Sequence, residues 1–114
     1  MLISSLKNQK YFDLVNKRGI KFHNASSVLV LAKNYPDSLN TQGQIIFGMK
    51  VSKKLGNAVI RNKIKRRIRH LVNFISKQMN PKLRLGLIVV PRKGFEKIAF
   101  STLVNEFSKT LINK

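Results

Sequence analysis

The sequence predicts a mixed fold of the α+β class, a single-domain α/β sandwich with the element order αβββαβα. Three observations predict it. The chain has 114 residues, 43% of them apolar, so residues 1–114 suffice for one domain with its own core. Segments with the two-residue period of a strand alternate with segments that have the period of a helix. A helical segment lies at each end, and a third lies between strands.

The first predicted element is a short helix over residues 6–18. Asn8 can cap its start, because its side chain can accept a hydrogen bond from a free backbone N–H of the first turn. Gly19 is expected to end the helix in a left-handed conformation. The mostly apolar side of this helix consists of Tyr11, Phe12, Leu14 and Val15.

Three strands are predicted next, over residues 20–23, 27–33 and 44–52. The polar segment 35–43 is expected to be a loop that joins two antiparallel strands. The two faces of the third strand differ, because alternate side chains point to opposite sides of a sheet. One face is apolar and is expected in the core; the other is expected to be partly open and contains Ile46, Gly48, Lys50 and Ser52.

The clearest predicted element is a helix over residues 57–79. Its apolar residues fall within an arc of roughly 120°; they are Ile60, Ile64, Ile68, Leu71, Val72, Ile75 and Met79. The opposite side is polar and contains Asn62, Lys65, Arg66 and Arg69, with Arg61 at its edge. A strand over residues 85–90, apolar enough to be covered on both faces, and a helix over residues 99–112 complete the fold.

The charge is the most unusual property of the chain. It has 23 Lys and Arg against 4 Asp and Glu, a formal net charge of +19. Self-repulsion of this size destabilises a compact state. A polyanionic partner is therefore the best explanation.

The composition excludes several kinds of site. The chain has no Cys, which excludes disulfides, thiol catalysis and Cys-based metal sites. Its two histidines, His23 and His70, are far apart, so no metal site is expected. Without a membrane-spanning apolar run or a signal peptide, the protein is expected in the cytoplasm, with no membrane partner.

The segment 50–69 holds nine basic residues and no acidic one. Such a segment is usually a solvated helix face, and that interpretation stays open. However, the cations Arg61, Lys65 and Arg69 repel one another at i, i+4 spacing, and a row of phosphates would offset this repulsion. Asn62 adds a neutral group that can contact a sugar hydroxyl or a base edge.

The turn before the long helix, residues 52–57, has two interpretations. Free N–H groups at a helix start favour an anion, and Lys53 and Lys54 flank them, so the turn could bind a phosphate. The alternative is an ordinary capped turn with two exposed lysines, and the phosphate site is the favoured interpretation.

This basic segment resembles the protein subunit of bacterial ribonuclease P. The strand–turn–helix signature of that family is matched by residues 51–59, VSKKLGNAV, and residues 61–69, RNKIKRRIR. The first helix also fits, with Leu6, Lys7, Phe12, Val15 and Gly19 at the family's spacing. The resemblance covers about residues 6–112.

The resemblance implies that the chain is a subunit of an endoribonuclease that removes the 5′ leader from precursor tRNA. Catalysis is then expected from a large RNA subunit, so no catalytic residue is assigned to this chain. Magnesium ions are expected to be held mainly by that RNA, with no cofactor bound by the protein alone and no DNA partner. The residues implied to contact the RNA subunit are Lys53, Lys54, Asn57, Arg61, Asn62, Lys65, Arg66 and Arg69.

The resemblance also implies a cleft for the single-stranded leader, between the first helix and the sheet. Its expected residues are Phe12, Asn16, Val30, Lys50 and Arg92. Asn16 and Val30 stand where the family often has aromatic residues, so base stacking should be weaker here. From the sequence alone, Phe12 could equally be a core aromatic.

Finally, the resemblance implies a left-handed crossover from the strand before the long helix to the strand after it, although about 98% of such crossovers are right-handed. Two alternatives to the implied function remain. One is a small structural RNA-binding protein of the ribosomal type. The other is a nuclease that acts without RNA, for which the four scattered carboxylates offer no acid/base or metal cluster.

Overall fold

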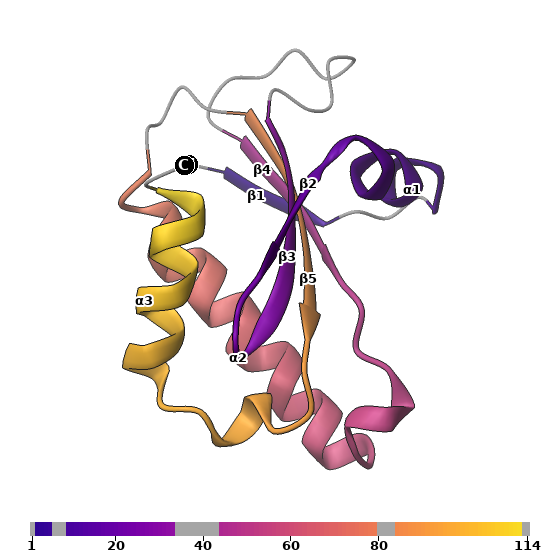
Figure 1. Ribbon diagram of the computed structural model, residues 1–114, viewed down its shortest axis with the longest axis vertical. Helices are drawn as coiled ribbons and strands as arrows, with labels where there is room; N and C mark the ends of the chain where they lie inside the picture. Colours follow the sequence, from indigo (N-terminus) through magenta and orange to yellow (C-terminus); the bar gives the residue numbers. More distant parts are fainter. Residues whose placement is uncertain (1, 6–8, 34–43, 80–83, 113–114) are drawn as a thin grey trace.

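The computed structural model describes residues 2–5, 9–33, 44–79 and 84–112. They form a five-stranded sheet in the order β1-β4-β5-β3-β2, with helix α1 on one face and helices α2 and α3 on the other (Figure 1). The strands are β1 (Leu2–Ser5), β2 (Ile20–His23), β3 (Ser27–Lys33), β4 (Gln44–Met49) and β5 (Arg84–Pro91). The helices are α1 (Gln9–Arg18), α2 (Ala58–Ser76) and α3 (Phe100–Leu111), with the 3-10 turns η2 (Lys53–Leu55) and η3 (Phe95–Lys97).

The predicted order of elements is confirmed from α1 onward, and β1 is an additional strand that was not predicted. It pairs in parallel with β4, with Leu2 opposite Gln44. Its four residues are too few to show a strand period, and pairing with β4 makes them extended. Sequence periodicity alone could not reveal this strand.

The central strand is β5, which pairs antiparallel with β3 and parallel with β4. The strands on either side of the predicted loop therefore run in opposite directions, but β5 lies between them. The loop itself, residues 35–43, lies outside the described residues. The crossover from β4 through α2 to β5 joins parallel strands, and its left hand stays a prediction.

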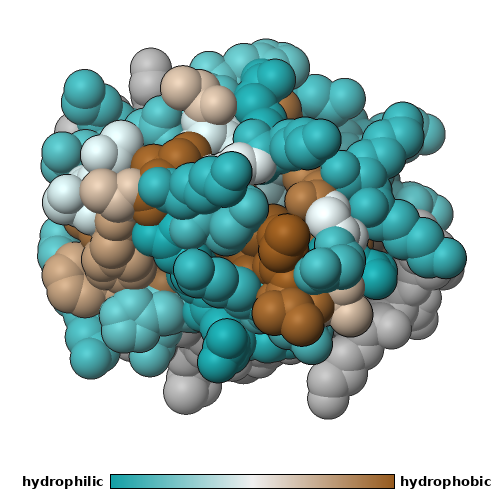
Figure 2. Space-filling model, turned by 90° about the horizontal axis from the view of Figure 1, so that it is seen from below, coloured by the Kyte–Doolittle hydropathy of each residue, from teal (hydrophilic) through white to brown (hydrophobic). Residues whose placement is uncertain are grey.

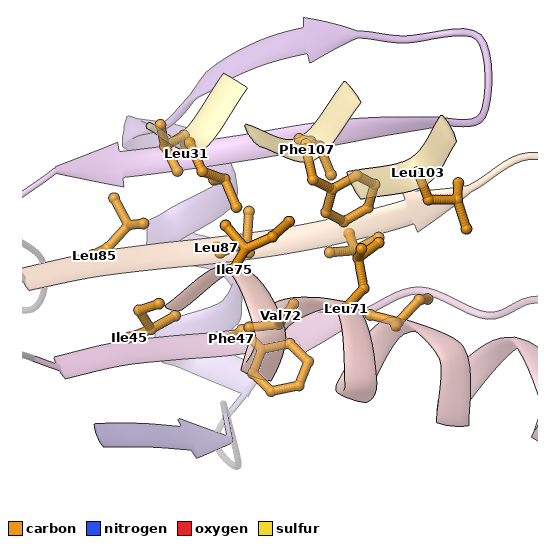
Figure 3. Close-up of a cluster of buried hydrophobic side chains, with 14 of the residues drawn as sticks. Leu31, Ile45, Phe47, Leu71, Val72, Ile75, Leu85, Leu87, Leu103 and Phe107 are labelled. Carbon is orange, nitrogen blue, oxygen red and sulfur yellow. The ribbon is translucent and has the colours of Figure 1, made fainter. Parts of the chain in front are cut away.

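The main core lies between the sheet and helices α2 and α3 (Figure 3). Alternate residues of the three inner strands point into it, for example Leu29, Phe47 and Leu87. The predicted apolar stripe of α2 is confirmed, because six of its seven residues are buried and Ile60 packs against them half-buried. This burial fixes the rotation of α2 and turns its polar side away from the sheet.

The ends of several elements differ from the predicted ends. Helix α2 ends at Ser76, although Met79 in the following turn is still buried. Strand β4 ends at Met49 rather than residue 52. Lys50 therefore follows the strand, and its backbone N–H donates to the Val89 carbonyl oxygen at 2.9 Å.

A second, smaller core lies under α1, where Val15 packs with Val30 and Ile88. Gly19 does not have the predicted left-handed conformation; its N–H continues the helix by donating to the Val15 carbonyl oxygen at 2.8 Å. A Cβ atom at this position would lie 2.6 Å from Val30 Cγ1. Gly19 therefore allows the helix end to approach β3 closely. Asn8, the predicted cap, lies outside the described residues.

Candidate nucleic-acid interface

The turn before α2 is fixed by local contacts. The side-chain oxygen of Asn57 caps the helix by accepting a hydrogen bond from the Ile60 N–H at 3.0 Å. Gly56 has a φ of 146°, and a Cβ atom there would lie 2.9 Å from Ile60 Cδ1, so glycine suits this position. Leu55 is buried, while Lys53 and Lys54 remain exposed. The turn therefore holds two exposed lysines beside the helix start, and its predicted phosphate site remains a prediction.

The outward side of α2 carries the predicted polar residues, which we call the basic face. It comprises Asn62, Lys65, Arg66 and Arg69. Arg66 and Arg69 are exposed and make no hydrogen bond or ion pair within the described part of the chain. Together with Asn62 and Val59, they line a hollow of about 450 Å³. Because no described residue partners these two cations, they can bind an external anion.

Two other arginines of α2 have different surroundings. Arg61 is half-buried, and its Nε atom is buried without a hydrogen-bond partner among the described residues. Arg67 is also half-buried, and its guanidinium donates to the carbonyl oxygens of Phe95, at 3.0 Å, and of Ile98. Arg67 thus ties η3 to α2. The sequence carried a signal for this role, since Arg67 lies three residues after Ile64 and four before Leu71, at the edge of the apolar stripe.

Hydrophilic side chains cover much of the end of the molecule where η2, the start of α2 and η3 meet (Figure 2). Apolar patches lie between them, and Val59, at the start of α2, is 76% exposed. The described surface around α2 therefore combines charged groups with apolar ones, as nucleic-acid interfaces often do.

The predicted cleft residues are only partly brought together. Phe12 and Asn16 are half-buried on α1. Phe12 packs against the smaller core, and the Nζ atom of exposed Lys50 lies 5.4 Å from the centre of its ring. Phe12 is thus partly a core residue and partly accessible beside a surface cation. Neither the interpretation as a core aromatic nor that as a cleft aromatic describes it alone.

Val30 requires a correction, because its exposed fraction is 1%. It lies under α1 in the smaller core, so it offers no surface to RNA. Strand alternation shows which residues take its place: Val28 and Val90 lie on the same face of the sheet beyond α1 and are half-buried. Counting two residues from Val30 along β3 would have found Val28.

Arg92 lies two residues beyond Val90, where β5 has ended. It is exposed, and its Nε atom donates to the Asn24 carbonyl oxygen at 3.1 Å. Its backbone N–H donates to the Ser26 carbonyl oxygen at 2.9 Å. Arg92 is therefore held at the turn between β2 and β3, at the end of the predicted cleft that lies away from α1.

The described carboxylates are dispersed. Glu106 on α3 accepts a hydrogen bond from buried Ser26, and Asp13 is exposed on α1. In the part of the chain that the structure describes, no group of three or more His, Cys, Asp or Glu residues could hold a metal ion. None of the described helices is both long and apolar enough to cross a membrane.

Comparisons with known proteins agree with this geometry. Residues 3–114 match the family model described as Ribonuclease P. The ribonuclease P protein component of Rickettsia bellii is 51% identical over 99% of this chain and 95% of its own, and that of Rickettsia canadensis is 52% identical over 98% of both. Among solved structures, the RNase P protein of Staphylococcus aureus superposes with a TM-score of 0.73 at 29% identity, covering 94% of this chain and 91% of its own. That of Thermotoga maritima has a TM-score of 0.76 at 25% identity, covering 97% of both chains.

Proposed function

The chain belongs to the ribonuclease P protein family and is an RNA-binding subunit of that enzyme, and on this basis we propose which RNA each of its surfaces binds. The turn before α2 and the basic face bind the RNA subunit. The cleft beside α1 binds the 5′ leader of precursor tRNA. Membership of this family does not favour the alternative of a structural ribosomal-type protein.

The observation that carries the proposal is that Arg66 and Arg69 have no hydrogen-bond or ion-pair partner among the described residues. Burial of the opposite side of α2 makes both arginines face solvent. A row of phosphates on the RNA subunit supplies the missing counter-charge. Lys53 and Lys54 extend this row at the helix start, and Lys65 and Asn62 lie within it. The half-buried Arg61 and the exposed Asn57 amide complete the proposed contact.

The proposed leader site runs along the sheet beyond α1. Phe12 supplies an aromatic surface at one end, with Asn16 four residues later on the same side of the helix. Exposed Lys50 lies beside the Phe12 ring, and Arg92 supplies a cation at the other end. A site with one aromatic and two cations should grip the leader backbone with little base preference, because phosphate contacts carry no sequence information.

Catalysis in this proposal belongs to the RNA subunit, whose magnesium ions activate the water that cleaves the leader. The described carboxylates of this chain do not form a magnesium site, so no catalytic step is assigned to them. The chain binds and orients both RNAs. We place this activity in the cytoplasm, without a DNA or membrane partner.

The test compares three reactions on one precursor tRNA in magnesium: protein alone, RNA subunit alone at a limiting magnesium concentration, and the two combined. We expect no cleavage by the protein alone and faster cleavage by the combination than by the RNA. Cleavage by RNA-free protein that survives repurification and is abolished by a point mutation in this chain would overturn the proposal. So would a combination no faster than the RNA subunit alone.

A further inference from the structure

A second hollow lies on the other side of the basic face, between α2 and the start of α3. Its volume is about 340 Å³, and it is lined by Lys63, Arg66, Arg67, His70 and Phe100. None of the residues named for the RNA-subunit contact lines it except Arg66, which borders both hollows. At 100° per residue, Lys63 and His70 lie about 100–160° around α2 from Lys65 and Arg69.

Aromatic rings form one wall of this hollow. The rings of His70 and Phe100 are 4.9 Å apart with an angle of 60° between them, and the ring of Phe74 meets Phe100 edge-on at 5.9 Å. Phe100 is held in place because it also packs against the main core. His70 is exposed, so the wall combines one ring held by the core with one ring open to solvent.

Cations form the rest of the lining. Arg67 is held by the carbonyl oxygens of Phe95 and Ile98. Lys63 and Arg66 are exposed, with no hydrogen bond or ion pair among the described residues. The described lining residues include no carboxylate. The hollow therefore offers a stacking surface and two cations that no described residue partners, the two features that bind a nucleotide through its base and its phosphate.

We propose that this hollow binds one unpaired nucleotide of the RNA subunit, with the base against His70 and Phe100 and a phosphate between Lys63 and Arg66. The nucleotide is unpaired because only an unstacked base exposes a face to an aromatic side chain. The RNA subunit is the source because Arg66 makes the hollow continuous with the basic face. The inference thus rests on the proposed function and adds a base-contacting site to it.

The first test measures the affinity of the full-length protein for the RNA subunit. We expect His70→Ala to weaken binding by about fivefold or more, the effect of losing one stacked base, and His70→Phe to restore it. Lys63→Ala should weaken binding and flatten the salt dependence of log K by about 0.7. The matched controls, His23→Ala and Lys109→Ala, remove an exposed histidine and an exposed lysine outside the hollow and should bind as the wild type does. Thermal melting checks that each variant is folded.

The second test maps base-specific chemical protection of both RNAs, the RNA subunit and a bound precursor tRNA, in their complex with the protein. We expect protection of an unpaired nucleotide that disappears with His70→Ala and returns with His70→Phe, while protections that depend on Arg69 remain. If the wild-type protein does not bind the RNA subunit at all, the proposed function fails. If it binds but His70→Ala changes neither affinity nor protection, or the lost protection lies on the precursor leader, this inference alone is overturned.

Discussion

The basic face of α2 and the proposed cleft beside α1 are built in different ways. The basic face comes from one helix, and the apolar stripe on the other side of that helix fixes its orientation. The cleft needs α1, β3, β5 and the residue after β4 to meet. A surface on one regular element follows from its own periodicity, whereas a surface shared by four elements depends on how they pack.

This difference predicts that the two sides of α2 respond in opposite ways to truncation. Ile68 has no exposed surface, so Ile68→Ala should lower the free energy of unfolding by roughly 2–5 kcal/mol. Val59→Ala, at a side chain that is 76% exposed, is the control and should change it by less than about 0.5 kcal/mol. Denaturant unfolding measures both. A wild-type stability for Ile68→Ala would show that the rotation assigned to α2 is wrong.

The adjacent arginines of α2 give a finer comparison. Arg67→Ala should lower the free energy of unfolding by about 1–3 kcal/mol, because it removes hydrogen bonds from a charged group that hold η3 to the helix. Arg66→Ala should leave stability within about 0.5 kcal/mol of the wild type, because Arg66 has no partner among the described residues. Denaturant unfolding of both variants measures the difference. If Arg66→Ala is the more destabilised variant, the structural role assigned to Arg67 is wrong.

The features that the sequence could predict belong to single elements, and those that it could not predict are shared by several elements. The stripe of α2 and the face of β4 that carries Ile45 and Phe47 were predictable, because each needs only the period of its own element. The pairing of β1, the position of β5 between β3 and β4, and the burial of Val30 were not, since each depends on contacts between distant segments. The sequence predicts that the first helix ends at Gly19. A glycine is needed there because the backbone lies close to Val30, and the sequence does not show this contact.

The cleft can be tested through tRNA that has or lacks a leader. Phe12→Ala should lower the ratio of precursor to mature tRNA affinity of the reconstituted enzyme, by about fivefold if one base stacks on the ring. Asn16→Phe should raise the ratio, because it adds a second ring one turn away. Mature tRNA affinity should stay constant, since mature tRNA has no leader. An unchanged ratio in both variants would mean that this side of α1 does not contact the leader.

The central claim is that the outward side of α2 binds the phosphates of the RNA subunit, and Arg66 tests it most directly. The measurement is the affinity of the protein for the RNA subunit over a range of salt concentrations, for the wild type and for Arg66→Ala. We expect weaker binding by the variant, a slope of log K against log salt that is flatter by about 0.7–0.9, and an unchanged melting temperature. A folded Arg66→Ala protein that binds with the wild-type affinity and the wild-type slope would contradict the claim.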